Sequence, residues 1–168
     1  MWRDRMEKDS VEISFVIPCL NEENSIGIVV AKAHQALAML GIPGEVIVAD
    51  NGSTDRSVEI AQACGARIVR VLDRGYGNAL RGGIEAARGR FILIGDADDS
   101  YDFLEAPRLL ERLKNGYDVV IGSRFLGTIR PGAMRWTSRI GNPLMTRILN
   151  WLFGLQITDS QSGMRAFT

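Results

Sequence analysis

The chain has 168 residues, which is the length of a single domain. Its 20 basic and 20 acidic residues cancel, and this balance argues against a nucleic-acid-binding protein because such proteins carry a basic excess. Two cysteines make no disulfide framework, and no apolar run reaches the ~18 residues that a membrane-spanning helix needs. The charge is unevenly spread, since six arginines follow Gly122 and the only acid there is Asp159.

Short segments rich in valine and isoleucine alternate with segments of helical apolar spacing. The predicted strands cover residues 13–18, 45–50, 66–72, 91–94 and 118–121. The predicted helices cover residues 24–40, 53–64 (with Ser53 or Thr54 as the N-cap), 76–87 and 104–114. This alternation predicts an α/β fold with a doubly wound, mostly parallel sheet and helices on both faces. Ligands of such sheets bind at the C-terminal ends of the strands, where the strand order reverses.

The last predicted helix spans residues 136–155 and has a wide apolar face. Leu144, Ile148, Trp151 and Leu152 form one stripe along it, and polar residues lie mostly opposite. One interpretation is an ordinary amphipathic helix that packs on the core. The other is a helix that lies on a membrane surface, where aromatic and aliphatic side chains enter the bilayer and arginines face lipid phosphates. The sequence leaves both interpretations open.

An acidic stretch follows the predicted strand 91–94. Asp96 and Asp98 are two residues apart, so on an extended backbone both carboxylates point to the same side. Two adjacent anions repel each other unless a cation lies between them. Mg²⁺ and Mn²⁺ suit these hard oxygens, and such ions often bind one or two carboxylates together with substrate phosphates. The alternative is a helix-capping turn that happens to be rich in aspartate.

Polar residues also follow the other predicted strands. Asn21 and Glu22 come after Pro18 ends the first strand, and Asp50 and Asn51 end the second, where they can contact a nucleobase or a ribose. Each group alone can be explained as a turn or a helix cap. Because all of them fall on one edge of one sheet, the sequence predicts a crevice for a nucleoside diphosphate.

Two further strand ends complete this edge. After the third strand, Gly75 and Gly77 let the backbone approach a ligand, but the segment is not a dinucleotide fingerprint because Leu80 occupies the position of the last small residue. After the fifth strand, Arg124 can bind a phosphate in bidentate fashion.

Six stretches occur along the chain in the order VIPCLNEE (16–23), VIVADNGSTD (46–55), RGYGNALRGGI (74–84), GDADDS (95–100), GSR (122–124) and DSQSGMRAF (159–167). In this combination the chain resembles glycosyltransferase family 2, whose members are inverting enzymes of the GT-A (Rossmann-like) fold. Within the family it is most similar to the dolichol-phosphate and polyprenyl-phosphate mannosyl- and glucosyltransferases.

The resemblance implies roles for individual residues. The residues that match the nucleotide-sugar site are Pro18, Asn21, Glu22, Asp50, Asn51, Gly77 and Asp96. Asp96 and Asp98 match the D-x-D carboxylates that bind Mg²⁺ or Mn²⁺. Many family members have a second aspartate where this chain has Asn51, which cannot pair with a cation and could alter the choice of nucleotide.

The resemblance also implies an acceptor side. Arg124 and Arg139 match arginines expected near the phosphates of donor and acceptor, while Asp159, Gly163 and Arg165 match the D-x-x-x-G-x-R segment. The implied catalytic residues are Asp98, Arg124 and Asp159. A polyprenyl phosphate is already ionised at neutral pH, so it needs no strong general base, whereas a saccharide hydroxyl would require a carboxylate such as Asp159 to take its proton.

The expected function is a metal-dependent, inverting transfer of a hexose from UDP-glucose or GDP-mannose to a dolichyl-type polyprenyl phosphate. The alternatives are a family-2 transferase acting on a saccharide hydroxyl and a non-catalytic module that binds a nucleotide sugar. Residues 1–168 are expected to form one catalytic domain of a longer membrane-associated protein, located at the cytoplasmic face of a membrane.

Overall fold

The computed structural model describes residues 11–126 and 136–168, without the side chains of residues 136–139. Its elements follow in the order β1 (Ile13–Cys19), α2 (Ile26–Leu40), β2 (Gly44–Asp50), α3 (Ser57–Ala63), β3 (Arg67–Arg70), α4 (Tyr76–Ala86), β4 (Phe91–Ile94), the 3₁₀ helix η1 (Phe103–Glu105), α5 (Ala106–Lys114), β5 (Val119–Ile121), α6 (Trp136–Phe153) and β6 (Arg165–Phe167).

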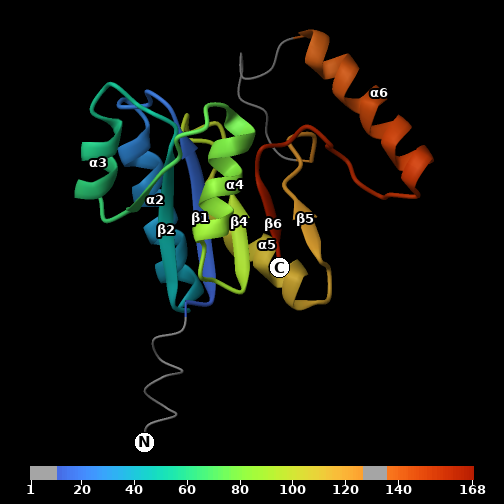
Figure 1. Ribbon diagram of the computed structural model, residues 1–168. Coiled ribbons are helices and arrows are strands. Elements are labelled where there is room, and N and C mark those ends of the chain that lie inside the picture. Colours follow the sequence, from blue (N-terminus) through green and yellow to red (C-terminus); the bar gives the residue numbers. More distant parts are fainter. Residues whose placement is uncertain (1–10, 127–135) are drawn as a thin grey trace, which may run out of the picture.

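One six-stranded sheet organises the described residues, with the strands in the order β3-β2-β1-β4-β6-β5 (Figure 1). Strands β3, β2, β1 and β4 are parallel, whereas β6 runs antiparallel to both β4 and β5. The strand order reverses between β1 and β4, because β2 lies on one side of β1 and β4 on the other. The predicted α/β class and mostly parallel sheet are confirmed.

Helices cover both faces of the sheet, as the sequence predicts. Every residue of β1 is buried, and its side chains alternate between the two faces. Phe15 packs among the residues of α2 and meets the ring of Phe103 edge to face at 5.3 Å. Val16 points the other way, toward α4, where a Cβ at Gly83 would overlap it. Gly83 therefore lets α4 lie close against β1.

Strand β6 was not predicted as a strand. Its three residues pair with β4 on one side and β5 on the other, so it is defined by contacts that are distant in the sequence. Because β5 and β6 are antiparallel, and so are β6 and β4, β5 points in the same direction as β4. The end of β5, where Arg124 follows, is consequently at the same edge of the sheet as the ends of β1 and β4.

The second predicted helix begins later than expected. It starts at Ser57, and neither Ser53 nor Thr54 caps it. Ser53 Oγ instead accepts a hydrogen bond from the Asn21 amide at 3.0 Å, and the Thr54 amide donates to Asn21 Oδ1 at 2.8 Å. The segment 51–56 is therefore drawn toward the loop after β1. Here tertiary contacts outweigh the local preference of serine and threonine for an N-cap.

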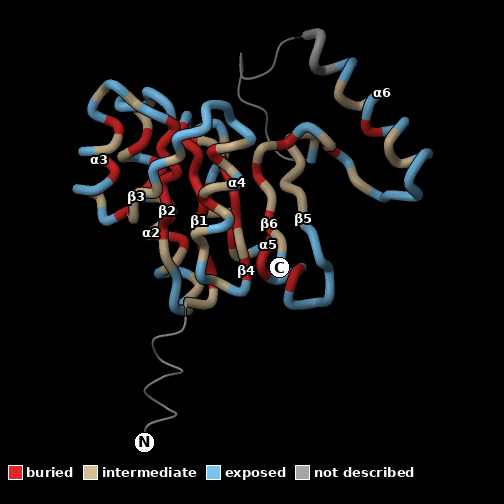
Figure 2. Tube along the Cα trace, in the orientation of Figure 1, coloured by how far each residue is buried: buried red, intermediate tan, exposed pale blue. Residues whose placement is uncertain are grey.

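Helix α6 stands off the sheet on the β5 side, and most of its described residues are exposed (Figures 1 and 2). Within the described residues, polar contacts join it to the segment that follows: the Ser160 amide donates to the buried Thr146 Oγ1 at 3.1 Å, and Asn150 Nδ2 donates to the Ile157 carbonyl at 2.8 Å. The apolar stripe faces outward, with Trp151 83% exposed. For the described residues, the interpretation as a core-facing helix is wrong.

Within residues 11–126 and 136–168, no helix combines the length and the hydropathy that crossing a membrane requires.

A polar network ties the edge of the sheet opposite the C-terminal strand ends. Glu45 Oε2 accepts from Arg67 Nε and Nη2 at 3.0 and 2.8 Å, and Oε1 accepts from Ser14 Oγ and the Arg88 amide, both at 2.9 Å. Burial by itself would raise the pKa of Glu45, but the hydrogen bonds from Arg67, Arg88 and Ser14 outweigh it and lower the pKa. The carboxylate therefore joins β1, β2 and β3 to the segment after α4.

We expect Glu45→Gln to reduce the free energy of unfolding at pH 7 by about 1–3 kcal/mol, because it removes charge-assisted hydrogen bonds from a partly buried site. The folded pKa of Glu45 lies below that of the unfolded chain. Its contribution is thus complete above the unfolded-state pKa and is lost as the pH falls through the folded value. Urea unfolding at pH 7 and under increasingly acidic conditions measures both effects.

The matched control is Glu59→Gln, which removes the exposed pair between Arg56 and Glu59 and should leave the free energy of unfolding almost unchanged. A Glu45→Gln protein as stable as the wild type at pH 7 would show that the network contributes nothing net.

Candidate active site

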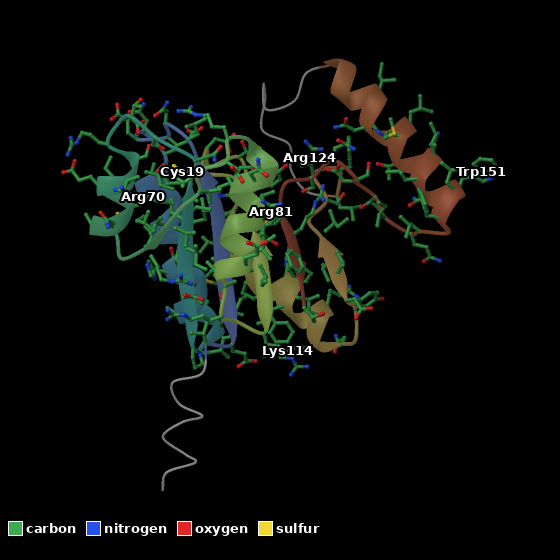
Figure 3. The ribbon with its side chains drawn as sticks, viewed as in Figure 1. Cys19, Arg70, Arg81, Lys114, Arg124 and Trp151 are labelled. Carbon is green, nitrogen blue, oxygen red and sulfur yellow. The ribbon has the colours of Figure 1, made fainter. Side chains whose placement is uncertain are left out.

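A cleft of about 340 Å³ lies at the C-terminal ends of the strands, where the strand order reverses between β1 and β4. Figure 3 shows Cys19 and Arg124 toward this edge and Lys114 at the opposite one. The residues that line the cleft come from the ends of β1, β2 and β4 and from the start of α4. They are Pro18, Cys19, Leu20, Glu22, Asn51, Arg74, Gly75, Tyr76, Ala79, Asp96, Ala97 and Asp98.

The two predicted metal ligands both line this cleft. Asp96 is partly buried, and its Oδ1 accepts a hydrogen bond from the Tyr76 hydroxyl at 2.7 Å. Asp98 is exposed, and its Oδ1 accepts from the Ser100 amide at 2.9 Å. Burial raises the pKa of Asp96, the Tyr76 hydrogen bond opposes this, and the charge of Asp98 raises the pKa further. The pair thus carries negative charge that the protein only partly compensates.

A divalent cation fits this donor set. Among the residues that the structure describes, no three histidine, cysteine, aspartate or glutamate side chains form a cluster able to enclose a metal. Mg²⁺ does not need such an enclosure, because it commonly binds one or two carboxylates and completes its shell with water and substrate phosphates. Asp96 and Asp98 supply that number of carboxylates on the wall of an open cleft.

The third acid of the stretch has a different task. Asp99 has a φ of 59°, which is rare for a residue with a side chain, and its Oδ1 accepts from Lys32 Nζ at 2.7 Å. This ion pair turns Asp99 toward α2. The turn therefore separates Asp99 from the two carboxylates that line the cleft.

Arg124 and Asp159 form a bidentate ion pair. Arg124 Nε donates to Asp159 Oδ2 at 2.7 Å, and Nη2 donates to Oδ1 at 2.9 Å. The Asp159 side chain is fully buried, while 28% of the Arg124 side chain is exposed. Burial would raise the pKa of Asp159, but the bonds from Arg124 outweigh it and lower the pKa. Both carboxylate oxygens are thus engaged, and neither residue is among those that line the cleft.

The segment after Asp159 approaches Asp96 directly. A Cβ at Gly163 would collide with the Asp96 carboxylate, and the Gly163 amide donates to the Tyr101 hydroxyl at 2.7 Å. Arg165 holds the same turn, because its Nε donates to the Ser162 carbonyl at 3.0 Å. The structure therefore brings the D-x-x-x-G-x-R segment to the acidic pair.

The loops after β1 and β2 hold each other. Asn21 has a φ of 58° and bonds to Ser53 and Thr54, while the Glu22 amide donates to Ser57 Oγ at 2.7 Å. Asp50 is buried, and its carboxylate accepts from the amides of Gly52 and Ser53 at 3.3 and 3.0 Å. Of the residues predicted to hold base and ribose, Pro18, Glu22 and Asn51 line the cleft, whereas Asn21 and Asp50 order the loops beside it.

The Asn51 side chain joins the end of β2 to the segment before α4 through three hydrogen bonds, which we call the Asn51 bracket. Its Nδ2 donates to the carbonyls of Val71 and Asp73 at 3.2 and 2.8 Å, and its Oδ1 accepts from the Gly75 amide at 2.7 Å. Gly75 has a φ of 122°, which side chains rarely tolerate. An aspartate at position 51 could not donate either of the first two bonds, so this network requires the amide.

For two of the predicted site residues, Gly77 and Arg139, the structure supplies no contact that supports the predicted role. A Cβ at Gly77 would meet nothing within 4 Å, so packing within the protein does not require glycine there. Arg139 falls in α6, and its side chain lies outside the described part of the structure.

Sequence reasoning gave no role to several residues of the cleft. Cys19 and Leu20 follow Pro18 directly, and Arg74 and Tyr76 lie around Gly75. Their position at the ends of predicted strands could have identified them as cleft residues from the sequence. Tyr76 in particular is the first residue of the helix after β3, so its side chain begins at the same edge as Asp96.

Comparison with known proteins places these features in a family context. A family model described as glycosyl transferase family 2 matches residues 14–167. A low-salt glycan biosynthesis hexosyltransferase of Haloferax volcanii is 44% identical over 158 residues, which cover 93% of this chain and 38% of the relative. A dolichyl-phosphate hexose transferase of the same organism is 34% identical over 158 residues, covering 93% of this chain and 66% of the relative.

Solved structures agree with this assignment. A glucosyl-3-phosphoglycerate synthase of Mycobacterium tuberculosis, in complex with Mn²⁺, UDP-glucose and phosphoglyceric acid, superposes with a TM-score of 0.72 at 28% identity. The match covers 97% of this chain and 58% of that one. The chain thus spans between 38% and 66% of the lengths of these relatives.

We expect Asn51→Asp to lower the free energy of unfolding by about 1–3 kcal/mol, because it replaces two donated hydrogen bonds by a carboxylate facing two carbonyl oxygens. UDP should also bind more weakly, since Arg74 and Gly75, at the end of the segment that Asn51 holds, line the cleft. Urea unfolding and calorimetric titration with UDP measure the two effects. Asn24→Asp makes the same change at an exposed position before α2 and should alter neither. Unchanged stability in the Asn51→Asp protein would contradict the bracket.

Proposed function

The chain belongs to glycosyltransferase family 2, and we propose that it transfers a hexose from UDP-glucose or GDP-mannose to a polyprenyl phosphate, with inversion at the anomeric carbon and with bound Mg²⁺ or Mn²⁺. The observation that carries the proposal is the position of Asp96 and Asp98 on one wall of a cleft at the reversal of strand order. A cleft of this size is typical of small-molecule sites.

The proposed donor site follows from the charges around the cleft. Asp96 and Asp98 would hold the metal, which when bound neutralises negative charge on the departing diphosphate. Arg124 and Arg165 both act electrostatically on Asp96, so their positive charges are close enough to assist. Arg74 adds a third guanidinium on the α4 side of the cleft. Pro18, Glu22 and Asn51 then surround the base and ribose.

A phosphate acceptor fits the site better than a saccharide hydroxyl. A hydroxyl acceptor needs a base, and the candidate base Asp159 is fully buried with both oxygens bonded to Arg124. We assign Asp159 instead to orienting Arg124, whose Nη1 forms no hydrogen bond among the described residues. A polyprenyl phosphate brings its own negative charge and can be steered by arginines. The name of the dolichyl-phosphate relative supports the same choice.

The outward face of α6 supports attachment to a membrane surface. Trp151, Leu152 and Phe153 are 83%, 57% and 67% exposed, and Leu144 is 58% exposed. Contiguous exposed apolar residues of this kind mark a protein or membrane contact. The proposed acceptor is a lipid. Because α6 is bonded through Thr146 to the segment containing Ser160, a membrane contact of α6 would bring the cleft to this substrate. We place the enzyme at the cytoplasmic face of the membrane.

Asp98→Ala should lower metal-dependent transfer by about 100-fold or more, because a metal at such a site supplies several kcal/mol of charge stabilisation. The measurement is radiolabel moved from UDP-glucose or GDP-mannose into an organic phase, with Mn²⁺ and polyprenyl phosphate present. The free energy of unfolding should stay at the wild-type value, since Asp98 is exposed. Asp118→Ala, an exposed aspartate before β5, is the matched control. Undiminished transfer by the Asp98→Ala protein contradicts the metal assignment.

The same assay separates the alternatives. Transfer by the wild-type chain to a soluble saccharide, but none to polyprenyl phosphate, would favour a saccharide acceptor. Calorimetric binding of a nucleotide sugar without transfer to any acceptor would favour a non-catalytic binding module.

Vesicles containing an anionic phospholipid should bind the wild-type chain more tightly than a Trp151→Ser, Phe153→Ser double variant. Both side chains are exposed, so the substitutions remove apolar surface without disturbing the core. Sedimentation with vesicles measures the bound fraction. Met39→Ser removes an apolar side chain that is 58% exposed in α2, away from α6, and should leave binding unchanged. Equal binding by wild type and double variant would rule out α6 as the contact.

A further inference from the structure

The Asp96 carboxylate is held from two sides by residues that the proposed chemistry has not used. On one side the Tyr76 hydroxyl donates to Oδ1 at 2.7 Å. On the other side Gly163 approaches so closely that a Cβ there would collide with Oδ2. The Gly163 amide is in turn fixed by the Tyr101 hydroxyl at 2.7 Å. The carboxylate is therefore restricted in rotation as well as in position.

The position of Tyr76 is itself determined by the β2 side of the cleft. Tyr76 is the first residue of α4, and Gly75 before it has a φ of 122°. The Gly75 amide donates to Asn51 Oδ1 at 2.7 Å, so the bracket at the end of β2 sets where α4 begins. A continuous path of contacts thus leads from Asn51 through Gly75 and Tyr76 to Asp96, and joins the two walls of the cleft.

We propose that Tyr76 is a positioning residue, whose hydroxyl orients the Asp96 carboxylate for a divalent cation while Gly163 leaves the space that this orientation needs. The inference rests on the proposed metal-dependent function. A carboxylate oxygen has two lone pairs, so Oδ1 can accept from Tyr76 and still bind an ion. Groups that hydrogen-bond to metal ligands typically change metal affinity by about 10-fold to 100-fold when they are removed.

The alternative is that Tyr76 only supports the fold or only contacts the donor. As a support it would be a poor choice, because the side chain lines the cleft and the residue is 54% exposed. As a donor contact alone it would not need a hydrogen bond to Asp96. The proposal differs from both alternatives because it alone predicts a loss of metal affinity, measured without nucleotide, at unchanged stability.

The test is titration of the protein with Mn²⁺ alone, with free Mn²⁺ measured by electron paramagnetic resonance. Tyr76→Phe keeps the ring and removes only the hydroxyl, so we expect Mn²⁺ affinity to fall by about 10-fold to 100-fold. Thermal stability and the affinity for UDP without metal should stay at wild-type values. Tyr117→Phe, at a tyrosine that is 56% exposed before β5, should bind Mn²⁺ as the wild type does. Asp96→Asn gives the reference for a lost ligand.

Gly163→Ala tests the same site independently, since the added Cβ would displace the Asp96 carboxylate while the Tyr76 hydroxyl stays in place. It should also weaken Mn²⁺ binding. Wild-type Mn²⁺ affinity in Tyr76→Phe overturns the inference, and so does a parallel loss of stability or of metal-free UDP binding. If the wild-type chain itself does not bind Mn²⁺, the proposed function fails first and the inference falls with it.

Discussion

Repulsion between the carboxylates of Asp96 and Asp98 is the constraint around which the cleft is built. The buried strand β4 ends directly before them, and the turn that follows directs Asp99 away to Lys32. The remaining two acids share one wall of the cleft, where partial burial raises the pKa of Asp96 and the charge of Asp98 adds to the effect. An anionic pair in such a place is stabilised by a cation, and the nearby arginines do not bond to either acid in the described structure.

A second feature links this pair to α6, the helix that we assign to the membrane. The segment 157–165 contains Asp159, which holds Arg124, and Gly163, which abuts Asp96. The same segment receives the polar face of α6, through the bond between Ser160 and Thr146. The apolar face of α6 is thereby left outward. One short stretch of chain thus contacts the proposed metal site, the arginine beside it and the helix that we assign to the membrane.

The sequence predicted well the parts of the molecule that are determined locally. The strand 91–94 was predicted with its observed limits, because a short apolar run is followed at once by a polar turn. Asp102 precedes the predicted helix 104–114, where aspartate is a favoured N-cap, and its carboxylate accepts from the Leu104 amide at the start of η1. The grouping of polar residues at one edge of the sheet also follows from the alternation of strands and helices alone.

Other features depend on contacts that no local pattern contains. Strand β6 exists only because β4 and β5 lie on either side of it, and three residues give no periodicity. Helix α6 has an amphipathic sequence, but the pattern cannot say that its polar side faces the protein. The role of Asn51 was also hidden, because its partners lie 20 to 24 residues later in the sequence. Amide side chains in turns have too many possible partners for the sequence to choose among them.

The most direct test of the central claim is the anomalous scattering of crystals soaked with Mn²⁺ and UDP. The account predicts a manganese peak within bonding distance of carboxylate oxygens of Asp96 and Asp98, with the UDP diphosphate completing the shell. Bound UDP with no manganese at these carboxylates, in crystals at neutral pH and with Mn²⁺ in excess, would contradict it.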